Sequence, residues 1–216
     1  MAIDFNEKDL QYELERIEKE SERIRENTNK IRKMKTNDIE HEKALIEIKK
    51  EIVDFDEEDL LRFTKNAIVN IHYFFSHEKY NQLKNYCSEE LIKKILDDKK
   101  KYRIDINMDN IRVGFAKIRD VYKKDDFFIK VHTSVFFYDD ARNNNAMGST
   151  SDKYWNDIWT ITYKRKKDEE ITNKCPNCGS LMEYNIGSKT FLCDYCRNTF
   201  MKEQMIWEIY DISVNE

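Results

Sequence analysis

The sequence predicts an α+β fold in which three helices pack on one side of a curved antiparallel sheet. One observation leads to this fold, and two others lead to the arm and the zinc ribbon predicted with it. Apolar residues recur at helical spacing early in the chain and alternate later, an order typical of α+β domains. Charged residues make up 37% of the 216 positions, and four of the five cysteines form two C-x-x-C pairs. We therefore expect an α+β domain over residues 57–213, a charged helical arm over residues 1–56, and a zinc ribbon over residues 172–202, inserted between the last two strands.

The arm is acidic and carries a heptad pattern. Residues 1–56 contain 16 acidic and 12 basic residues, whereas the rest of the chain has 26 of each and is formally neutral. A helix is predicted over residues 8–50, which hold neither glycine nor proline. Its seam has spacings of four and three residues, at Leu10, Leu14, Ile17, Ser21, Ile24, Thr28 and Ile31. The seam falters at residues 36–38, where the helix either turns back as a hairpin or continues against another partner.

The apolar seam residues are candidates for partner binding. We expect a protein partner or a second copy of the chain to bind this stripe, formed by Leu10, Leu14, Ile17, Ile24 and Ile31. The alternative is a solvated helix that lies on its own domain. So narrow a stripe favours a partner helix, because a broad globular face would cover it poorly.

The domain itself begins with helices. Asp56 is a suitable N-cap, and apolar residues at helical spacing predict a helix that continues to about His77. A short helical piece follows at about residues 80–86, and Ser88 is expected to cap a third helix. Cys87 stands alone beside that cap and is expected to be a small buried apolar residue.

Alternating patterns then predict the sheet. Four strands are expected, at residues 111–122, 129–137, 155–166 and 203–212. An irregularity is expected near Lys117 in the first strand, and residues 139–153 form a polar loop. In the last strand, Met205, Trp207 and Ile209 should share one face.

The cysteine pairs predict one structural zinc ion. Two residues separate the cysteines within each pair, so one tight turn can direct both thiolates at the same ion. The predicted ligands are Cys175, Cys178, Cys193 and Cys196. Gly179 allows a left-handed residue after the first pair, whereas Arg197 stands where a second glycine would be expected. Four ligands leave no open position, which favours a structural Zn²⁺ over the alternatives, a redox dithiol or an iron site.

Composition disfavours several classes of protein. The sequence contains no run of about 18 apolar residues, so no membrane span is predicted. Acidic residues near the N-terminus do not fit a secretory signal. The paired cysteines suit a reducing compartment, so we expect a cytoplasmic protein. Nucleic-acid binding is disfavoured because the body is neutral. Aromatic side chains of the ribbon could stack on bases, but are expected to form its core: Tyr184, Phe191, Tyr195 and Phe200.

A small-ligand-binding or enzymatic hollow is the alternative to an interaction module. His132 and Asp157 lie on predicted strands, and Tyr73 lies on the helix that would cover them. Nothing in their spacing joins them, and His132 alternates with the apolar face of its strand. We therefore expect no enzyme, and a surface or hydrogen-bonded role for this histidine.

Several segments together resemble a known family. They are Ile68–Phe75, Leu83–Ile95, Tyr154–Tyr163, the two cysteine pairs and Trp207–Tyr210. Over residues 57–213 the chain resembles the bacterial Tim44-like domains that carry a zinc ribbon, within the NTF2-like superfamily. The resemblance implies a non-catalytic module, because the mitochondrial relatives tether a chaperone to a translocation channel. Those relatives also touch membrane lipid, so the resemblance implies peripheral membrane contact, although a charged arm here replaces the membrane anchor of many such proteins.

Overall fold

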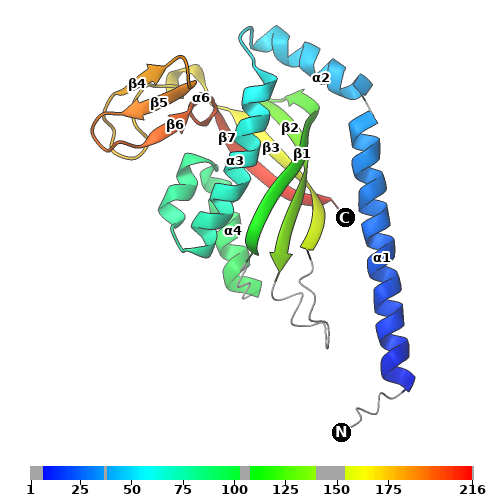
Figure 1. Ribbon diagram of the computed structural model, residues 1–216. Helices are drawn as coiled ribbons and strands as arrows, with labels where there is room; N and C mark the ends of the chain where they lie inside the picture. The colour runs from blue at the N-terminus through cyan, green and yellow to red at the C-terminus, as the bar shows by residue number, and fades with distance from the viewer. Residues whose placement is uncertain (1–6, 37, 103–107, 140–153, 216) are drawn as a thin grey trace. The chain divides into compact units, whose positions relative to one another are not determined.

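The chain folds into two compact units, Met1–Asn37 and Asp38–Glu216. The computed structural model describes residues 7–36, 38–102, 108–139 and 154–215 (Figure 1). Within them, helices precede an antiparallel sheet, so the predicted α+β class is confirmed. The predicted polar loop, apart from its first residue, lies outside the described residues.

The first unit is a single helix, α1 (Glu7–Thr36). Its 30 residues make it about 45 Å long at 1.5 Å per residue. The helix ends where the heptad seam falters. Three of the predicted seam residues are exposed, Leu14 at 54%, Ile17 at 52% and Ile24 at 59%, while Ile31 is half-buried. The side chain of Leu10 lies outside the described residues.

Helix α2 (Asp38–Glu51) belongs to the second unit, so the arm is shorter than the predicted residues 1–56. The apolar residues of α2 follow a different phase from the seam. Ile39 and Ile46 are exposed, whereas the others face the body. Ala44 and Ile48 are buried in the main core. His41 of α2 also contacts the body, with its Nδ1 3.1 Å from the carbonyl oxygen of Ile118. The arm therefore consists of α1 alone.

The remaining helices begin where the sequence predicts. Helix α3 (Glu57–Ser76) is capped by Asp56, whose side chain accepts a hydrogen bond from the N–H group of Asp59. The short 3₁₀ helix η1 (Tyr80–Asn85) follows, and then α4 (Glu89–Tyr102). The hydroxyl of Ser88 accepts from the N–H group of Leu91, as expected for an N-cap.

The main sheet is antiparallel, with the strand order β1-β2-β3-β7. Its strands are β1 (Met108–Lys123), β2 (Phe127–Asp139), β3 (Tyr154–Arg165) and β7 (Trp207–Asn215). The register of β1 against β2 shifts on either side of Lys117, which confirms the predicted irregularity. Such shifts increase local twist and bend the strand. Figure 1 shows the long strands curving together, with α3 against the sheet.

The start of the last strand was predicted wrongly. Residues 203–206, expected to be extended, belong instead to the one-turn helix α6 (Lys202–Ile206), and β7 begins only at Trp207. The side chain of Gln204 accepts a hydrogen bond from the N–H group of Met201 and closes this turn. As a result Met205 packs beside the cysteines, whereas Trp207 and Ile209 pack in the main core.

The main core lies between α3 and the sheet. Phe63 of α3 packs against Tyr163 of β3, with ring centroids 5.8 Å apart. The Tyr163 hydroxyl donates to Thr64 Oγ1 at 2.9 Å, and that hydroxyl in turn donates to the carbonyl oxygen of Leu60. Burial raises the pKa of Tyr163 above its ordinary value. Both buried hydroxyls of this interface are therefore hydrogen-bonded, which avoids a large desolvation cost.

Residues just before α4 protect the outer edge of β7. The N–H group of Ile209 donates to the carbonyl oxygen of Tyr86 at 2.7 Å, and Ser88 N–H donates to Ile209 at 2.9 Å. Cys87 lies between these bonds and is buried, as expected. Burial raises the pKa of its thiol to about 12. The short pairing prevents β7 from presenting a free edge at this point.

We expect Tyr163→Phe to lower the free energy of unfolding of the body by about 1 kcal/mol, because the buried Thr64 hydroxyl loses its donor. Urea unfolding followed by circular dichroism measures the change. Tyr210→Phe, which removes a partly exposed hydroxyl, serves as the control and should change stability little. Equal effects of the two substitutions would contradict the role given to the buried hydrogen bond.

Candidate metal centre

The cysteines lie in a small lobe inserted between β3 and β7, which we call the cysteine lobe (residues 172–202). It contains a three-stranded sheet of β4 (Met182–Asn185), β5 (Thr190–Cys193) and β6 (Thr199–Met201), in the order β4-β5-β6. The hairpin between β4 and β5 turns at Gly187 and Ser188. Because Arg165 and Trp207 are paired in the main sheet, the lobe leaves and rejoins the body at neighbouring points.

The two cysteine turns share one backbone geometry. In each turn, the residue four positions after the first cysteine donates its N–H group to that cysteine's carbonyl oxygen, at 2.8 Å. This residue is Gly179 in the first turn and Arg197 in the second. Both have positive φ angles, 77° and 59°. The sequence predicted a left-handed residue after the first turn, and the second turn adopts the same conformation despite its arginine side chain.

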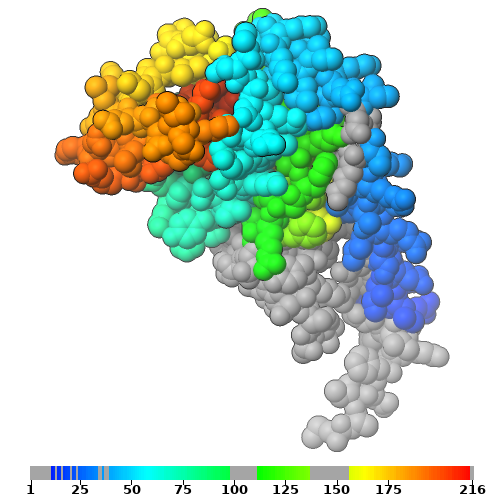
Figure 2. All heavy atoms as spheres, turned by 45° about the horizontal axis from the view of Figure 1, so that its top comes forward, coloured from blue at the N-terminus to red at the C-terminus, as the bar shows by residue number. Residues whose placement is uncertain are grey.

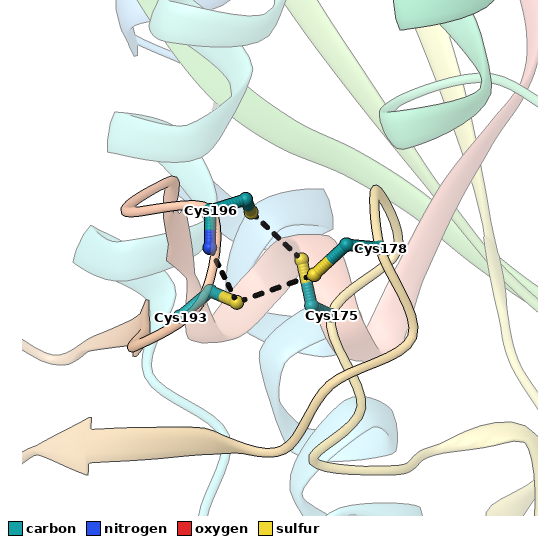
Figure 3. A group of neighbouring side chains, drawn as sticks. All are labelled: Cys175, Cys178, Cys193 and Cys196. Atoms are coloured by element: carbon teal, nitrogen blue, oxygen red, sulfur yellow. Dashed lines mark hydrogen bonds between the residues drawn. The ribbon is translucent and has the colours of Figure 1, made fainter.

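The four sulfur atoms converge on one point (Figure 3). All lie within 4.8 Å of one another; the Sγ atoms of Cys175 and Cys196 are 3.6 Å apart, and those of Cys178 and Cys193 are 3.5 Å apart. A tetrahedral four-thiolate zinc site has metal–sulfur bonds of about 2.3 Å, which separate its sulfur atoms by about 3.8 Å. All four cysteines are free of disulfide bonds. The arrangement therefore fits one metal ion.

The environment of the cysteines favours thiolates on the outer side of the cluster. A backbone hydrogen bond from Ser180 lowers the pKa of Cys178 to about 6, and one from Asn198 lowers the pKa of Cys196. On the inner side, burial raises the pKa of Cys175 to about 11. A divalent ion would offset the cost of a buried thiolate there, because thiolate ligands bind metal in the deprotonated form.

The lobe has little apolar core of its own. Its buried side chains, Cys175, Met182, Cys193 and Phe200, form one small cluster with Met205 of α6. Of the four aromatic residues considered above, Phe200 is buried and Phe191 packs against this cluster, as expected for core residues. Tyr184 and Tyr195 are exposed, the latter at 80%, contrary to that expectation.

Salt bridges hold the lobe against the body. Lys189, the residue before β5, places its Nζ 2.7 Å from a carboxylate oxygen of Asp56 and 2.6 Å from one of Asp59. The Asp59 side chain is only 8% exposed and also pairs with Arg62 at 2.7 Å. A second pair joins Lys202 to Asp54 at 2.9 Å. Figure 2 shows the yellow and orange atoms of the lobe packed against the cyan atoms of the α3 region.

The three residues considered for acid–base chemistry do not come together. His132 of β2 pairs with Thr160 of β3, whereas Asp157 of β3 pairs with Val135 of β2. Because side chains alternate along a strand, His132 and Asp157 lie on opposite faces of the sheet. Tyr73 is partly exposed, and its hydroxyl accepts a hydrogen bond from Lys79.

His132 instead lines a hollow of about 550 Å³ between α2 and the first two strands. Its charged walls include Lys43 and Glu47 of α2 and Lys130 of β2. Arg119 also lines it and forms an ion pair with Glu40. Burial lowers the pKa of His132, so the imidazole favours its neutral form. The sequence did not predict this hollow, because its walls come from segments that only the packing of α2 brings together.

No protein-family model, curated protein or solved structure matches the chain. None of the helices among the described residues combines the length and apolar character needed to cross a bilayer.

We expect the purified protein to contain one metal ion per chain and Cys178→Ser to lose it. The serine hydroxyl is a poor substitute for a thiolate on a soft ion, so bound metal should fall at least tenfold. Elemental analysis after gel filtration measures the metal content. Cys87→Ala provides a matched control, since Cys87 lies outside the cluster. Retention of metal by Cys178→Ser would contradict the assignment of this ligand.

Arg197→Gly should stabilise the second cysteine turn. The residue has a φ of 59°, where a side chain costs roughly 1 kcal/mol and glycine does not. We expect slower release of metal to a chelator, measured with a colorimetric acceptor. The control is Asn177→Gly, at a position without a positive φ angle. A faster release from Arg197→Gly would show that the arginine side chain contributes more than its backbone strain costs.

Proposed function

We propose that the chain is a non-catalytic protein-interaction or scaffolding module whose cysteine lobe is held by one structural zinc ion. The observation that carries the functional part is the exposed apolar stripe of α1. This stripe lies on a highly charged helix that forms a compact unit of its own. A solvated helix gains nothing from Leu14, Ile17 and Ile24 on one side, whereas a partner helix would bury them.

The donor set favours zinc. Four thiolates at near-tetrahedral separations match the closed structural sites of Zn²⁺, and they leave no position for a water molecule or a substrate. Iron also accepts four thiolates, so metal analysis decides between the two ions. The small apolar cluster of the lobe gives a further reason for a metal, because a unit this size cannot bury enough surface to fold unaided. In this proposal the ion stabilises the lobe and takes no part in chemistry.

We also propose that residues 57–213 form a Tim44-like domain of the NTF2-like superfamily, with the lobe as its zinc ribbon. Support comes from the order of the elements, helices first and then a bent antiparallel sheet, and from the position of the lobe between β3 and β7. A cytoplasmic location and peripheral membrane contact stay expectations of the composition and of this resemblance.

A second candidate function is small-ligand binding in the hollow beside His132. The specific observation in its favour is the volume of about 550 Å³, which lies in the range of small-molecule sites. Its walls carry charges of both signs, so a polar ligand would fit better than the apolar one expected for a concave sheet. Native mass spectrometry of the purified protein tests this candidate, since a retained small molecule that is lost in His132→Ala would support it.

Removal of α1 should separate the interaction from the fold. We expect the full chain, purified from its host under native conditions, to retain a protein partner, either another chain or a second copy. Residues 38–216 should lose that partner because the exposed stripe is gone. The truncated protein should still unfold cooperatively and contain one metal ion, because α2 and the lobe belong to the body. The same partner bound to both proteins, or to neither, would contradict the proposed function.

A further inference from the structure

We propose that α1 pairs with α1 of a second copy of this chain, in antiparallel orientation. This inference rests on the proposed function and specifies its partner. It follows from the distribution of charge along α1, from the residues at the seam, and from the charges beside the seam.

Charge is divided unevenly between the two halves of α1. Residues 7–20 contain six acidic and three basic residues, net −3, whereas residues 21–36 contain two acidic and six basic residues, net +4. A parallel pair would place the acidic halves side by side and the basic halves side by side. An antiparallel pair places each acidic half against the basic half of the other copy. Complementary charge thus favours a second copy as the partner and the antiparallel orientation of the pair.

The seam residues give the same orientation. Ser21 and Thr28 are the polar members of the seam. In a parallel pair each would face its own counterpart, so two layers of the interface would contain no apolar side chain. An antiparallel pair in which Ser21 faces Ile24 also sets Thr28 against Ile17. Every layer between Leu14 and Ile31 then contains a leucine or an isoleucine.

The charges beside the seam distinguish the two orientations further. In this register Glu18 of one helix lies opposite Arg25 of the other, and the contact occurs twice because the pair is symmetric. Both residues are exposed in the single chain and so are available for such contacts. In a parallel heptad pair, by contrast, the position of Glu18 faces that of Glu13 of the other copy, which is repulsive.

The bias in charge also suits a solitary helix, since acidic residues near the N-terminus and basic residues near the C-terminus favour the helix dipole. That explanation accounts for the charges but not for the apolar stripe. It predicts that the protein is a monomer, both with and without substitutions at the seam. The two explanations therefore differ in the mass of the protein in solution.

Sedimentation equilibrium of the full purified chain tests the pairing. We expect a dimer, and a monomer after Ile17→Asp combined with Ile24→Asp. Tyr12→Asp is the matched control, because Tyr12 is exposed on α1 but lies off the seam, and this variant should remain a dimer. Helix content, followed by circular dichroism, separates loss of pairing from loss of the helix. A monomeric parent protein, or a dimer that survives the double substitution, would overturn the proposal.

Glu18→Arg tests the orientation. In the antiparallel pair it converts two attractive contacts with Arg25 into two repulsive ones, so we expect the dimer dissociation constant to rise about tenfold. The added substitution Arg25→Glu should restore the parent value. A parallel pair predicts the opposite sign for Glu18→Arg, because it would relieve the repulsion from Glu13. Tighter or unchanged association would overturn the antiparallel assignment. If the parent is a monomer but α1 retains a different protein from the host, this inference fails while the proposed function stands.

Discussion

Strand β3 is the element on which the rest of the body depends. Residues 157–163 are buried without interruption, although the strand keeps its alternating geometry. It pairs with β2 on one side and with β7 on the other, and its Tyr163 joins the sheet to α3 through the hydroxyl of Thr64. A strand buried in this way must have a partner at each edge, because unpaired backbone groups in a core are costly. The second partner, β7, follows the cysteine lobe in the sequence. The sheet can therefore be completed only after the lobe has been synthesised.

The two units are stabilised by different interactions. The body, Asp38–Glu216, relies on apolar packing between α3 and the main sheet. Helix α1 carries its charge in two blocks and has only a narrow apolar stripe, so packing within one chain contributes little to it. Within the body, the cysteine lobe differs again, because only a few buried side chains and the four cysteines stabilise it.

Much of this architecture could be predicted from local signals. The helix caps at Asp56 and Ser88, the bend near Lys117 and the convergence of the four cysteines each depend on residues close together in the chain. Three features could not be predicted in this way. Helix α2 belongs to the body because Ile48 is buried in the main core. Helix α6 forms where a strand was expected, because hydrogen bonds at Met201 stabilise a single helical turn. The salt bridges of Lys189 join residues about 130 positions apart in the sequence, and local sequence patterns do not predict contacts at such a separation.

The position of the lobe in the sheet bears on how such a protein can change over generations. Arg165 and Trp207 are partners in the register of β3 and β7, so the chain between them starts and ends at almost the same point in space. A tight turn could span the same gap and leave the strand pairing intact, because the entropic cost of closing a loop depends only weakly on its length. Insertion, loss or exchange of a lobe at this point therefore demands no change in the pairing of β3 with β7. The junction is a natural grafting site, where new recognition surfaces can be acquired while the sheet beneath them is inherited unchanged.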